Sequence, residues 1–350
     1  MWTYLSAFLG SLILSYLLTP LIKKMAIYVG AVDQPNKRRI NTEPVPSIGG
    51  VAIYIAFILT LIVFVPLHRV TIGLIIGCSF ILLVGLLDDL YEISPLLKLL
   101  GQIIAAGILL FFGIKAEFIT NPFNGAVVYL GYWSIPLTLL WTVGITNTVN
   151  LVDGLDGLAT GITAIAAFTL FLVGLQEGQV IAAIMAVALA GSSLGFLKFN
   201  FYPAKIFMGD TGAMFSGFAL AAISVSGALK SAAAVTIIVP ILALGVPIFD
   251  TVFAIVRRLY NGKPISEADN GHIHHRLLAL GFNQRQAVLS VYGISVGLGL
   301  MALIINGANF HSALLILLVV IVTLIYGAWK LGVFTVELPA DGRSLEKGNI

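Results

Sequence analysis

Residues Asn147–Gly157 have the sequence NTVNLVDGLDG, which places two carboxylates and two carboxamides between two long apolar segments. Polar groups in such a place are costly unless they pair, face a wet cavity or bind a ligand. Asn147, Asn150 and Asp153 recur every three residues, so they would share one face of a continuing helix. The two glycines favour a break that exposes backbone groups. We interpret the stretch as part of an active site, and the alternative is that an aspartate only caps the following helix.

The composition predicts an all-α polytopic integral membrane protein. Hydrophobic residues make up 59% of the 350 positions and charged residues 10%, whereas soluble domains average about 25% charged residues. The net charge of +3 is too small to indicate a nucleic-acid partner. The single cysteine, Cys78, lies in an apolar run, which excludes an intrachain disulfide and a cysteine-based metal site.

Long apolar segments predict about 11 transmembrane helices, at roughly 20 residues for each crossing. All of the 19 Lys and Arg residues except Arg69, Lys115 and Lys230 lie in connections on one side. The positive-inside rule then places the N-terminus outside and the C-terminus in the cytoplasm of a plasma-membrane protein. Residues 118–132, with Asn-Gly near their centre, predict a small outer β-hairpin. The predicted spans are 3–22, 48–67, 70–87, 95–113, 133–150, 157–175, 179–197, 212–229, 232–256, 286–306 and 311–330.

We therefore expect one transmembrane catalytic domain over residues 1–335 and a polar cytoplasmic tail over residues 336–350. The long polar connections would lie on the cytoplasmic side, and most of the candidate functional residues are found in them or at their borders. The lipid bilayer is thus one expected partner of the chain.

Acidic side chains mark two further connections. Asp88 and Asp89 end the third span, where they repel each other and the helix dipole, and a divalent cation would relieve that repulsion. Lys98 lies inside the next span, so it either snorkels to the surface or binds a phosphate. Asp210 stands between glycines before a later span and is a candidate ligand or a helix cap.

Three of the five histidines fall within four positions, His272, His274 and His275, directly before Arg276. A histidine-only transition-metal site is one interpretation, but the many aspartates favour an oxygen-ligated cation such as Mg²⁺. Asp250 lies seven residues before Arg257 on nearly the same helical face. Partial pairing with the basic end of its own span is one interpretation, and a contact with the site is the other. Acids and cations together at one membrane surface predict Mg²⁺-assisted phosphoryl chemistry on an amphiphile.

Six motifs, in this order along residues 1–330, resemble the polyprenyl-phosphate N-acetylhexosamine-1-phosphate transferase family. The resemblance implies transfer of a sugar 1-phosphate from a UDP-sugar to undecaprenyl phosphate, with Mg²⁺ or Mn²⁺ as cofactor, and a homodimer. The motifs are Pro46–Gly50, Asp88-Asp89, Lys98–Gln102, Asn147–Gly157, Phe207–Gly212 and His272–Arg276.

The same resemblance implies a role for each candidate residue. Asp210 is similar to a metal ligand, Asp89 to a neighbour near the metal, and Asp88 to an aspartate that orients or deprotonates the lipid phosphate. Phe207 matches an aromatic side chain that stacks on uracil. We expect the catalytic residues to be Asp88, Asp89, Asp153 and Asp156; the metal ligands Asp210 and Asp89; and the substrate-binding residues Lys98, Asn147, Asn150, Phe207, His272, His274, His275 and Arg276.

The donor follows from the histidine motif. The branch of the family that uses UDP-MurNAc-pentapeptide has three consecutive histidines, whereas residues 272–276 are HIHHR, which resembles the UDP-GlcNAc branch. We predict undecaprenyl-pyrophosphoryl-GlcNAc and UMP as products, for a teichoic acid linkage unit or an O-antigen. The peptide-bearing donor is the alternative. An ion-coupled secondary transporter is an alternative from another class, but the acids cluster at one surface rather than at the midplane.

Overall fold

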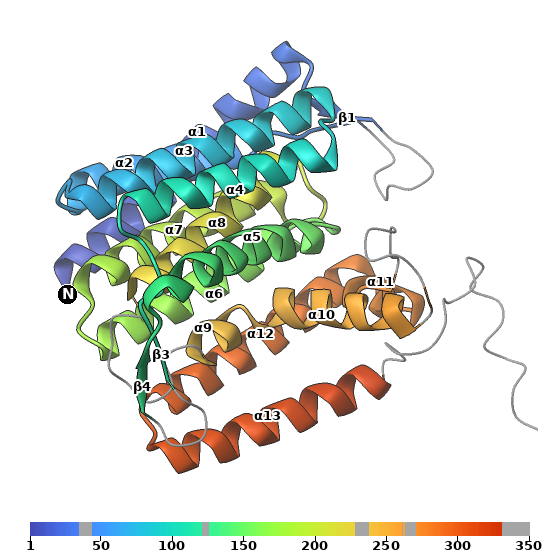
Figure 1. The fold of residues 1–350 in the computed structure, drawn as a ribbon. Coiled ribbons are helices and arrows are strands. Elements are labelled where there is room, and N and C mark those ends of the chain that lie inside the picture. The colour runs from blue at the N-terminus through green and yellow to red at the C-terminus, as the bar shows by residue number, and fades with distance from the viewer. Residues whose placement is uncertain (35–43, 121–125, 228–237, 261, 263–270, 331–350) are drawn as a thin grey trace, which may run out of the picture.

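The structure is a computed structural model that describes residues 1–34, 44–120, 126–227, 238–260, 262 and 271–330. The predicted tail, residues 336–350, lies outside these described residues. Long helices run side by side and form the body of the molecule (Figure 1). They are α1 (Trp2–Val29), α2 (Gly50–Phe64), α3 (Arg69–Tyr91), α4 (Pro95–Phe111), α5 (Ser134–Val152), α6 (Leu158–Gln176), α7 (Val180–Asn200), α8 (Gly209–Gly227), α10 (Gly245–Tyr260), α12 (Gln284–Asn306) and α13 (Phe310–Lys330), with the short helices η1 (Gly131–Trp133), α9 (Ile238–Ala243) and α11 (Ile273–Ala279).

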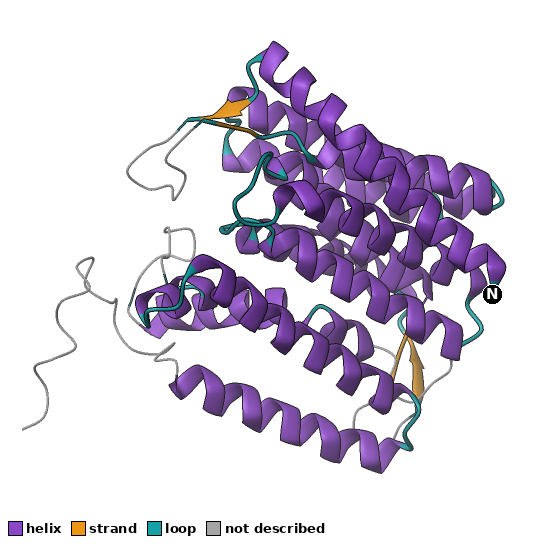
Figure 2. Cartoon of the chain, turned by 180° about the vertical axis from the view of Figure 1, so that it is seen from behind, coloured by secondary structure: helices purple, strands orange, loops and turns teal. Residues whose placement is uncertain are grey.

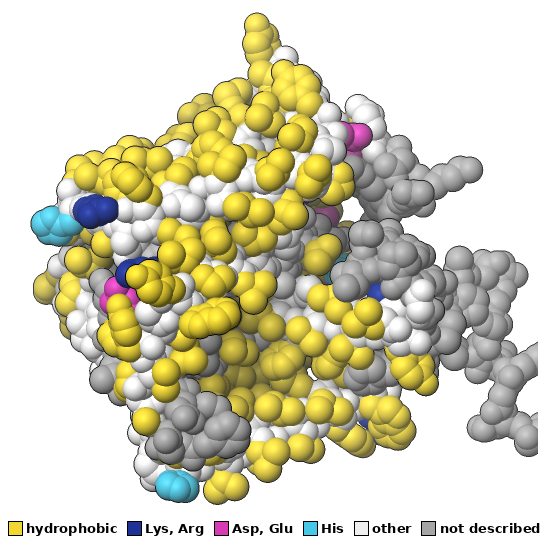
Figure 3. Space-filling model, in the orientation of Figure 1, with side chains coloured by type: hydrophobic (Ala, Val, Ile, Leu, Met, Phe, Trp, Pro, Cys, Tyr) yellow, Lys and Arg dark blue, Asp and Glu magenta, His cyan; other side chains and the backbone are white. Residues whose placement is uncertain are grey.

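The helical membrane character predicted from composition is confirmed. Within the described ranges, seven helices are long and apolar enough to cross a membrane, namely α1, α3, α5 with η1, α6, α7, α12 and α13, and α2 and α4 are shorter apolar helices. Hydrophobic side chains cover the flanks of the molecule, and the charged side chains visible in Figure 3 lie mostly toward its two ends. The protein is therefore a multi-pass membrane protein, and the number of 11 spans and their orientation stay predictions.

One predicted span is not a single continuous helix. The segment 232–256 contains α9 and α10, which are separated at Leu244. Pro247 has no N–H to donate to the carbonyl one turn earlier, and its ring suits the first turn of a new helix. The described part of this predicted span is therefore a broken helix.

Short strands occur at both ends of the bundle. The predicted hairpin is confirmed by β3 (Phe118–Thr120), which pairs antiparallel with β4 (Val127–Tyr129), although its turn lies outside the described residues. A second ribbon, β1 (Val32–Asp33) with β2 (Val45–Pro46), was not predicted. Figure 2 shows the hairpin at the end that holds the N-terminus and the other ribbon at the opposite end.

Helix α8 is the central helix of the body and is buried along nearly its whole length. Two glycines allow its first turn to be approached closely. A Cβ atom at Gly50 would lie 2.0 Å from the Cα of Gly212, and one at Gly85 would lie 2.7 Å from the carbonyl oxygen of Asp210. The start of α2 and the end of α3 are thereby fixed against the start of α8.

Candidate active site

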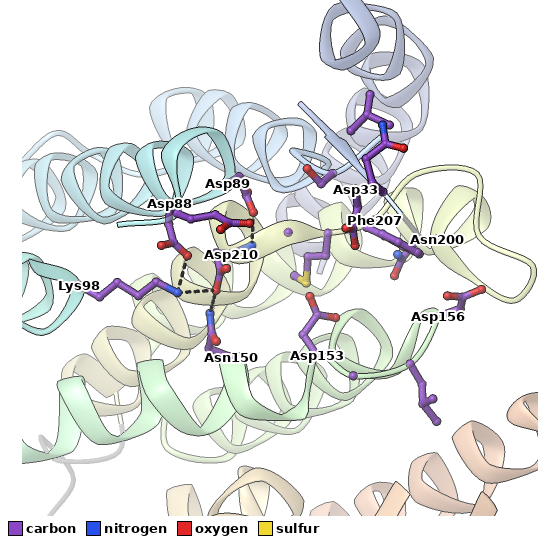
Figure 4. Close-up of a pocket in the computed structure, with 18 of the residues that line it drawn as sticks. Asp33, Asp88, Asp89, Lys98, Asn150, Asp153, Asp156, Asn200, Phe207 and Asp210 are labelled. Carbon is purple, nitrogen blue, oxygen red and sulfur yellow. Dashed lines mark hydrogen bonds and ion pairs between the residues drawn. The ribbon is translucent and has the colours of Figure 1, made fainter. Parts of the chain in front are cut away.

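The ends of several helices enclose a cavity of about 820 Å³ at the end of the bundle that carries β1 and α11. Figure 4 shows the carboxylates around it, which come from β1, the end of α3, the turn after α5 and the start of α8. Its lining combines many acidic groups with amides, one lysine and one aromatic ring. The polar and aromatic lining residues are Asp33, Gln34, Ser47, Asp88, Asp89, Glu92, Lys98, Asn150, Asp153, Asp156, Asn200, Phe207, Asp210, His275 and Gln284.

Lys98 joins two of the predicted aspartates. Its Nζ forms an ion pair with Asp88 and lies 3.4 Å from Oδ1 of Asp210 (Figure 4). Asn150 donates a hydrogen bond from Nδ2 to the same oxygen of Asp210. Lys98 therefore faces the cavity rather than only snorkelling, and side chains from α3, α4, α5 and α8 form one network.

Asp89, unlike Asp88, binds the start of α8. Its Oδ1 accepts a hydrogen bond from the backbone N–H of Asp210 at 2.9 Å, and its Oδ2 accepts from the N–H and the hydroxyl of Thr211 at 2.9 and 2.5 Å. The carboxylate thus caps the N-terminus of α8, where the helix dipole favours negative charge. Gly209, with φ of 72°, leaves room for it, because a Cβ there would lie 2.5 Å from Oδ2 of Asp89.

This cap explains how two adjacent aspartates are tolerated at the end of α3. One of them faces the cavity and pairs with Lys98, and the other neutralises the first turn of α8. Because Oδ2 of Asp89 already accepts two bonds, the geometry favours a positioning role for Asp89 over the predicted metal ligation. Asp210 is the residue that this cap holds in place.

Asp153 and Asp156 follow the end of α5. Burial and the nearby charges of Asp210 and Asp89 raise the pKa of Asp153 to about 8. Asp156 accepts a hydrogen bond at Oδ2 from the N–H of Ala204, at 2.9 Å, and burial raises its pKa. The wall of the cavity formed by residues 153–156 is therefore tied to the loop after α7, and Asp153 is crowded by like charges.

A metal ion needs several donor atoms around one point, and the cavity offers mainly carboxylate oxygens. Among the described residues, no group of three or more His, Cys, Asp or Glu side chains is already arranged around one point. Asp88, Asp153 and Asp210 nevertheless supply only oxygen donors, which Mg²⁺ prefers. Lys98 provides positive charge between Asp88 and Asp210. The residues fit a hard cation by chemistry, on condition that Lys98 moves toward another partner.

The predicted histidine group does not enter the cavity as a whole. His275 lines it, whereas Nδ1 of His272 lies 2.8 Å from Oδ2 of Asp250. His274 is buried against Gly154, and burial together with His275 lowers its pKa to about 3. The Nε of Arg276 donates to the carbonyl of Gly271 at 3.0 Å. The structure therefore brings only His275 to the position expected of all four residues.

Asn147 is also absent from the lining residues. Its Nδ2 donates to Oε1 of Gln102, at 2.6 Å, and to the carbonyl of Val143, and its Oδ1 accepts from Gln102 in return. The amide pair links α4 to α5. The three-residue spacing predicted the helix correctly, but Asn147 faces the neighbouring helix and not the cavity.

Six polar residues line the cavity but are not among the predicted site residues, namely Asp33, Gln34, Ser47, Glu92, Asn200 and Gln284. Asp33 belongs to β1, Asn200 ends α7, and Gln284 begins α12. Asn200 accepts a hydrogen bond from Thr160 at 2.6 Å and donates to the carbonyl of Ile206. A polar side chain at the end of an apolar span was a usable signal for Asn200. Gln284 gave no such signal, because the start of a helix is an ordinary place for a polar residue.

The fold and the cavity together define a class: multi-pass membrane proteins with an acidic, lysine-containing site at one end of a helical bundle. Residues 71–228 match the model of glycosyl transferase family 4. The chain is 41% identical to a Bacillus subtilis (strain 168) protein described as a probable undecaprenyl-phosphate N-acetylglucosaminyl 1-phosphate transferase, over 90% of this chain and 88% of that protein. The chain belongs to this family, which confirms the resemblance inferred from its motifs.

Other relatives are similar over most of their length. The decaprenyl-phosphate N-acetylglucosaminephosphotransferase of Mycolicibacterium smegmatis is 35% identical over 81% of this chain and 77% of its own length. The phospho-N-acetylmuramoyl-pentapeptide-transferase of Clostridium perfringens (strain SM101) is 30% identical over 82% of this chain and 90% of its own. The relatives named for N-acetylglucosamine are thus more similar to this chain than the one named for the muramoyl pentapeptide.

Proposed function

We propose that the protein transfers GlcNAc 1-phosphate from UDP-GlcNAc to undecaprenyl phosphate and releases UMP. The observation that carries the proposal is the network of Asp88, Lys98 and Asp210 inside the cavity, in a chain so similar to the Bacillus subtilis protein. Phosphoryl transfer needs positioned cations and oxygen donors rather than much covalent chemistry. The cavity has both.

The reaction needs little help from a base. A phosphate monoester has a second pKa of about 6, so the lipid phosphate is largely a dianion at neutral pH. One of its oxygens forms a bond to the β-phosphorus of the donor, and the bond from that phosphorus to the bridging oxygen breaks, so UMP leaves with the electron pair. Asp88 orients the acceptor in this scheme. A covalent aspartyl-phosphate intermediate is not required.

Asp210, with Asp88, would hold Mg²⁺, which supplies charge neutralisation on the departing UMP. Asn150 fixes Asp210 by its hydrogen bond. Lys98 turns from the two carboxylates toward the phosphates of the donor, where its ammonium group neutralises developing charge. Phe207 provides an aromatic face in the cavity wall for the uracil ring.

The donor and the side of the membrane are supported by different observations. The relatives described as N-acetylglucosamine transferases are 41% and 35% identical to the chain, and the muramoyl-pentapeptide transferase is 30% identical. The asymmetry of Lys and Arg residues favours a cytoplasmic cavity, where UDP-sugars are found. The product would begin a cell-envelope glycan, such as a teichoic acid linkage unit or an O-antigen.

The test is a transfer assay with the purified protein in detergent, undecaprenyl phosphate, Mg²⁺ and either UDP-GlcNAc or UDP-MurNAc-pentapeptide. We expect UMP and lipid product from UDP-GlcNAc and none from UDP-MurNAc-pentapeptide. Addition of EDTA or the substitution Asp210→Asn should abolish the formation of both products. Lys115→Ala is the matched control, because Lys115 pairs with Glu117 at the other end of the bundle. Release of UMP only from the peptide-bearing donor would refute the assigned sugar. No lipid-dependent UMP release from a folded preparation would refute the enzyme.

A further inference from the structure

Asp250 of α10 connects the histidine segment to the rest of the bundle. Asp250 is 3% exposed, and both of its side-chain oxygens bind the start of α11. Oδ1 accepts the backbone N–H of Ile273 at 2.8 Å, and Oδ2 lies 2.8 Å from Nδ1 of His272. An ionised carboxylate can only accept here, so Nδ1 of His272 carries the proton. The contact fixes the ring as well as the backbone.

The rings of His272, His274 and His275 lie next to one another between Asp250 and the cavity. His272 and His274 are stacked with centroids 5.7 Å apart and planes 5° apart, and the rings of His274 and His275 are 4.2 Å apart. The ring of His274 lies directly on Gly154, where a Cβ would come within 2.5 Å of Nε2. His275 then lines the cavity.

A second contact, between Arg257 and Gly271, restrains the backbone just before His272. A Cβ at Gly271 would lie 2.4 Å from Cζ of Arg257, so the guanidinium of this buried α10 residue packs on the backbone just before His272. Two side chains of α10 therefore hold the residues that lead into α11. Neither of these side chains lines the cavity.

We propose that Asp250 is a positioning residue for the transfer reaction: by binding His272 and the backbone N–H of Ile273 it fixes the start of α11, which places His274 on Gly154 and His275 against the substrate. His272 has no direct contact with substrate in this arrangement. A displacement of about 1 Å at a reacting site can lower the rate by about 100-fold, so the anchoring contact matters although it lies outside the cavity. The proposal rests on the proposed function for its activity measurements.

The sharpest test exchanges His272 for two amides. His272→Asn presents a donor near the position of Nδ1 and can still bind Asp250, whereas His272→Gln presents one near Nε2. We expect His272→Asn to retain most of the transfer activity and His272→Gln to lose about 10- to 100-fold. The reverse order would show that the Nε2 side of His272 contacts the substrate, and it would overturn the proposal.

A double-mutant cycle tests the coupling. Asp250→Ala and His272→Ala should each lower kcat/KM for UDP-GlcNAc, and the loss should divide between kcat and KM as it does in His275→Ala. The double variant should have a kcat/KM no lower than that of either single variant. Additive losses would overturn the proposal. Absence of transfer by the wild-type protein would instead refute the proposed function.

The last test measures the rate of thiol labelling and does not depend on enzyme activity. Cys78 is the single cysteine of the chain and is buried, and His274 is 3% exposed. A thiol introduced by His274→Cys should react slowly with a water-soluble maleimide while Asp250 is present. Combination with Asp250→Ala should raise the labelling rate by about 10-fold or more, because local release exposes the thiol. An unchanged rate in a folded preparation would overturn the proposal.

Discussion

Replacing Asp89 by asparagine distinguishes a helix cap from a metal ligand. An asparagine keeps one acceptor oxygen but turns the other into an NH₂ group, which cannot accept from α8. If the amide nitrogen replaces Oδ2, the N–H and hydroxyl of Thr211 both lose their acceptor; if it replaces Oδ1, the N–H of Asp210 does. A buried donor without a partner costs about 1–3 kcal/mol. We expect a decrease of that size in the free energy of unfolding.

The assay is unfolding in mixed detergent micelles together with the Mg²⁺ dependence of UMP release. Thr211→Val is the control, because it removes one hydroxyl from the same cap and should cost about 0.5–1.5 kcal/mol. In Asp89→Asn, the Mg²⁺ concentration that gives half-maximal rate should change little. A variant as stable as the wild type whose Mg²⁺ requirement rises about tenfold or more would refute the capping argument.

Three further predictions concern the walls of the cavity. Lys98→Met should slow UMP release about 100-fold. It should also lower the Mg²⁺ concentration that gives half-maximal rate, because Lys98 no longer competes with the cation for Asp88 and Asp210. An unchanged Mg²⁺ dependence would contradict the idea that Lys98 and Mg²⁺ share these two carboxylates. Gly154→Ala should push the ring of His274 away, because the added Cβ would lie 2.5 Å from Nε2, and we expect a loss of kcat that leaves folding intact by circular dichroism. His274 has a pKa lowered from 6.5 to about 3, so the stability it contributes is present above pH 6.5 and lost as the pH falls toward 3. As the pH falls through that range, the free energy of unfolding of the wild type should decrease more than that of His274→Gln. If the two free energies change in parallel with pH, His274 is not a buried neutral ring.

The sequence was sufficient for the parts of the fold that hydropathy determines. Long apolar runs predict membrane helices from local composition alone, and the hairpin at residues 118–129 follows from turn chemistry. Polar residues at the ends of apolar runs were equally informative, because such positions are costly without a role. Asp88, Lys98, Asn150, Asp153, Asp156, Phe207, Asp210 and His275 all line the cavity as expected.

What could not be predicted depends on partners far away in the sequence. The bonds from Asp89 to the start of α8 span 121 and 122 positions, and the pair of Asn147 with Gln102 spans 45. Spacing along one helix places a side chain on a face but does not say which helix that face meets. The sequence left the role of Asp250 open, with partial pairing to the basic end of its own span as one alternative, and only the fold shows that its oxygens bind His272 and the N–H of Ile273 in the following segment.

The lining of the cavity extends from Val32, the first residue of β1, to Gln284 at the start of α12. A ribosome that adds about 5–20 residues per second needs roughly 10–50 s to make the chain between these two residues. During synthesis the helices that precede α12 can already be made while one wall of the cavity is still missing. A nascent chain that has not yet reached α12 therefore lacks part of the cavity wall, so the site is completed late in synthesis.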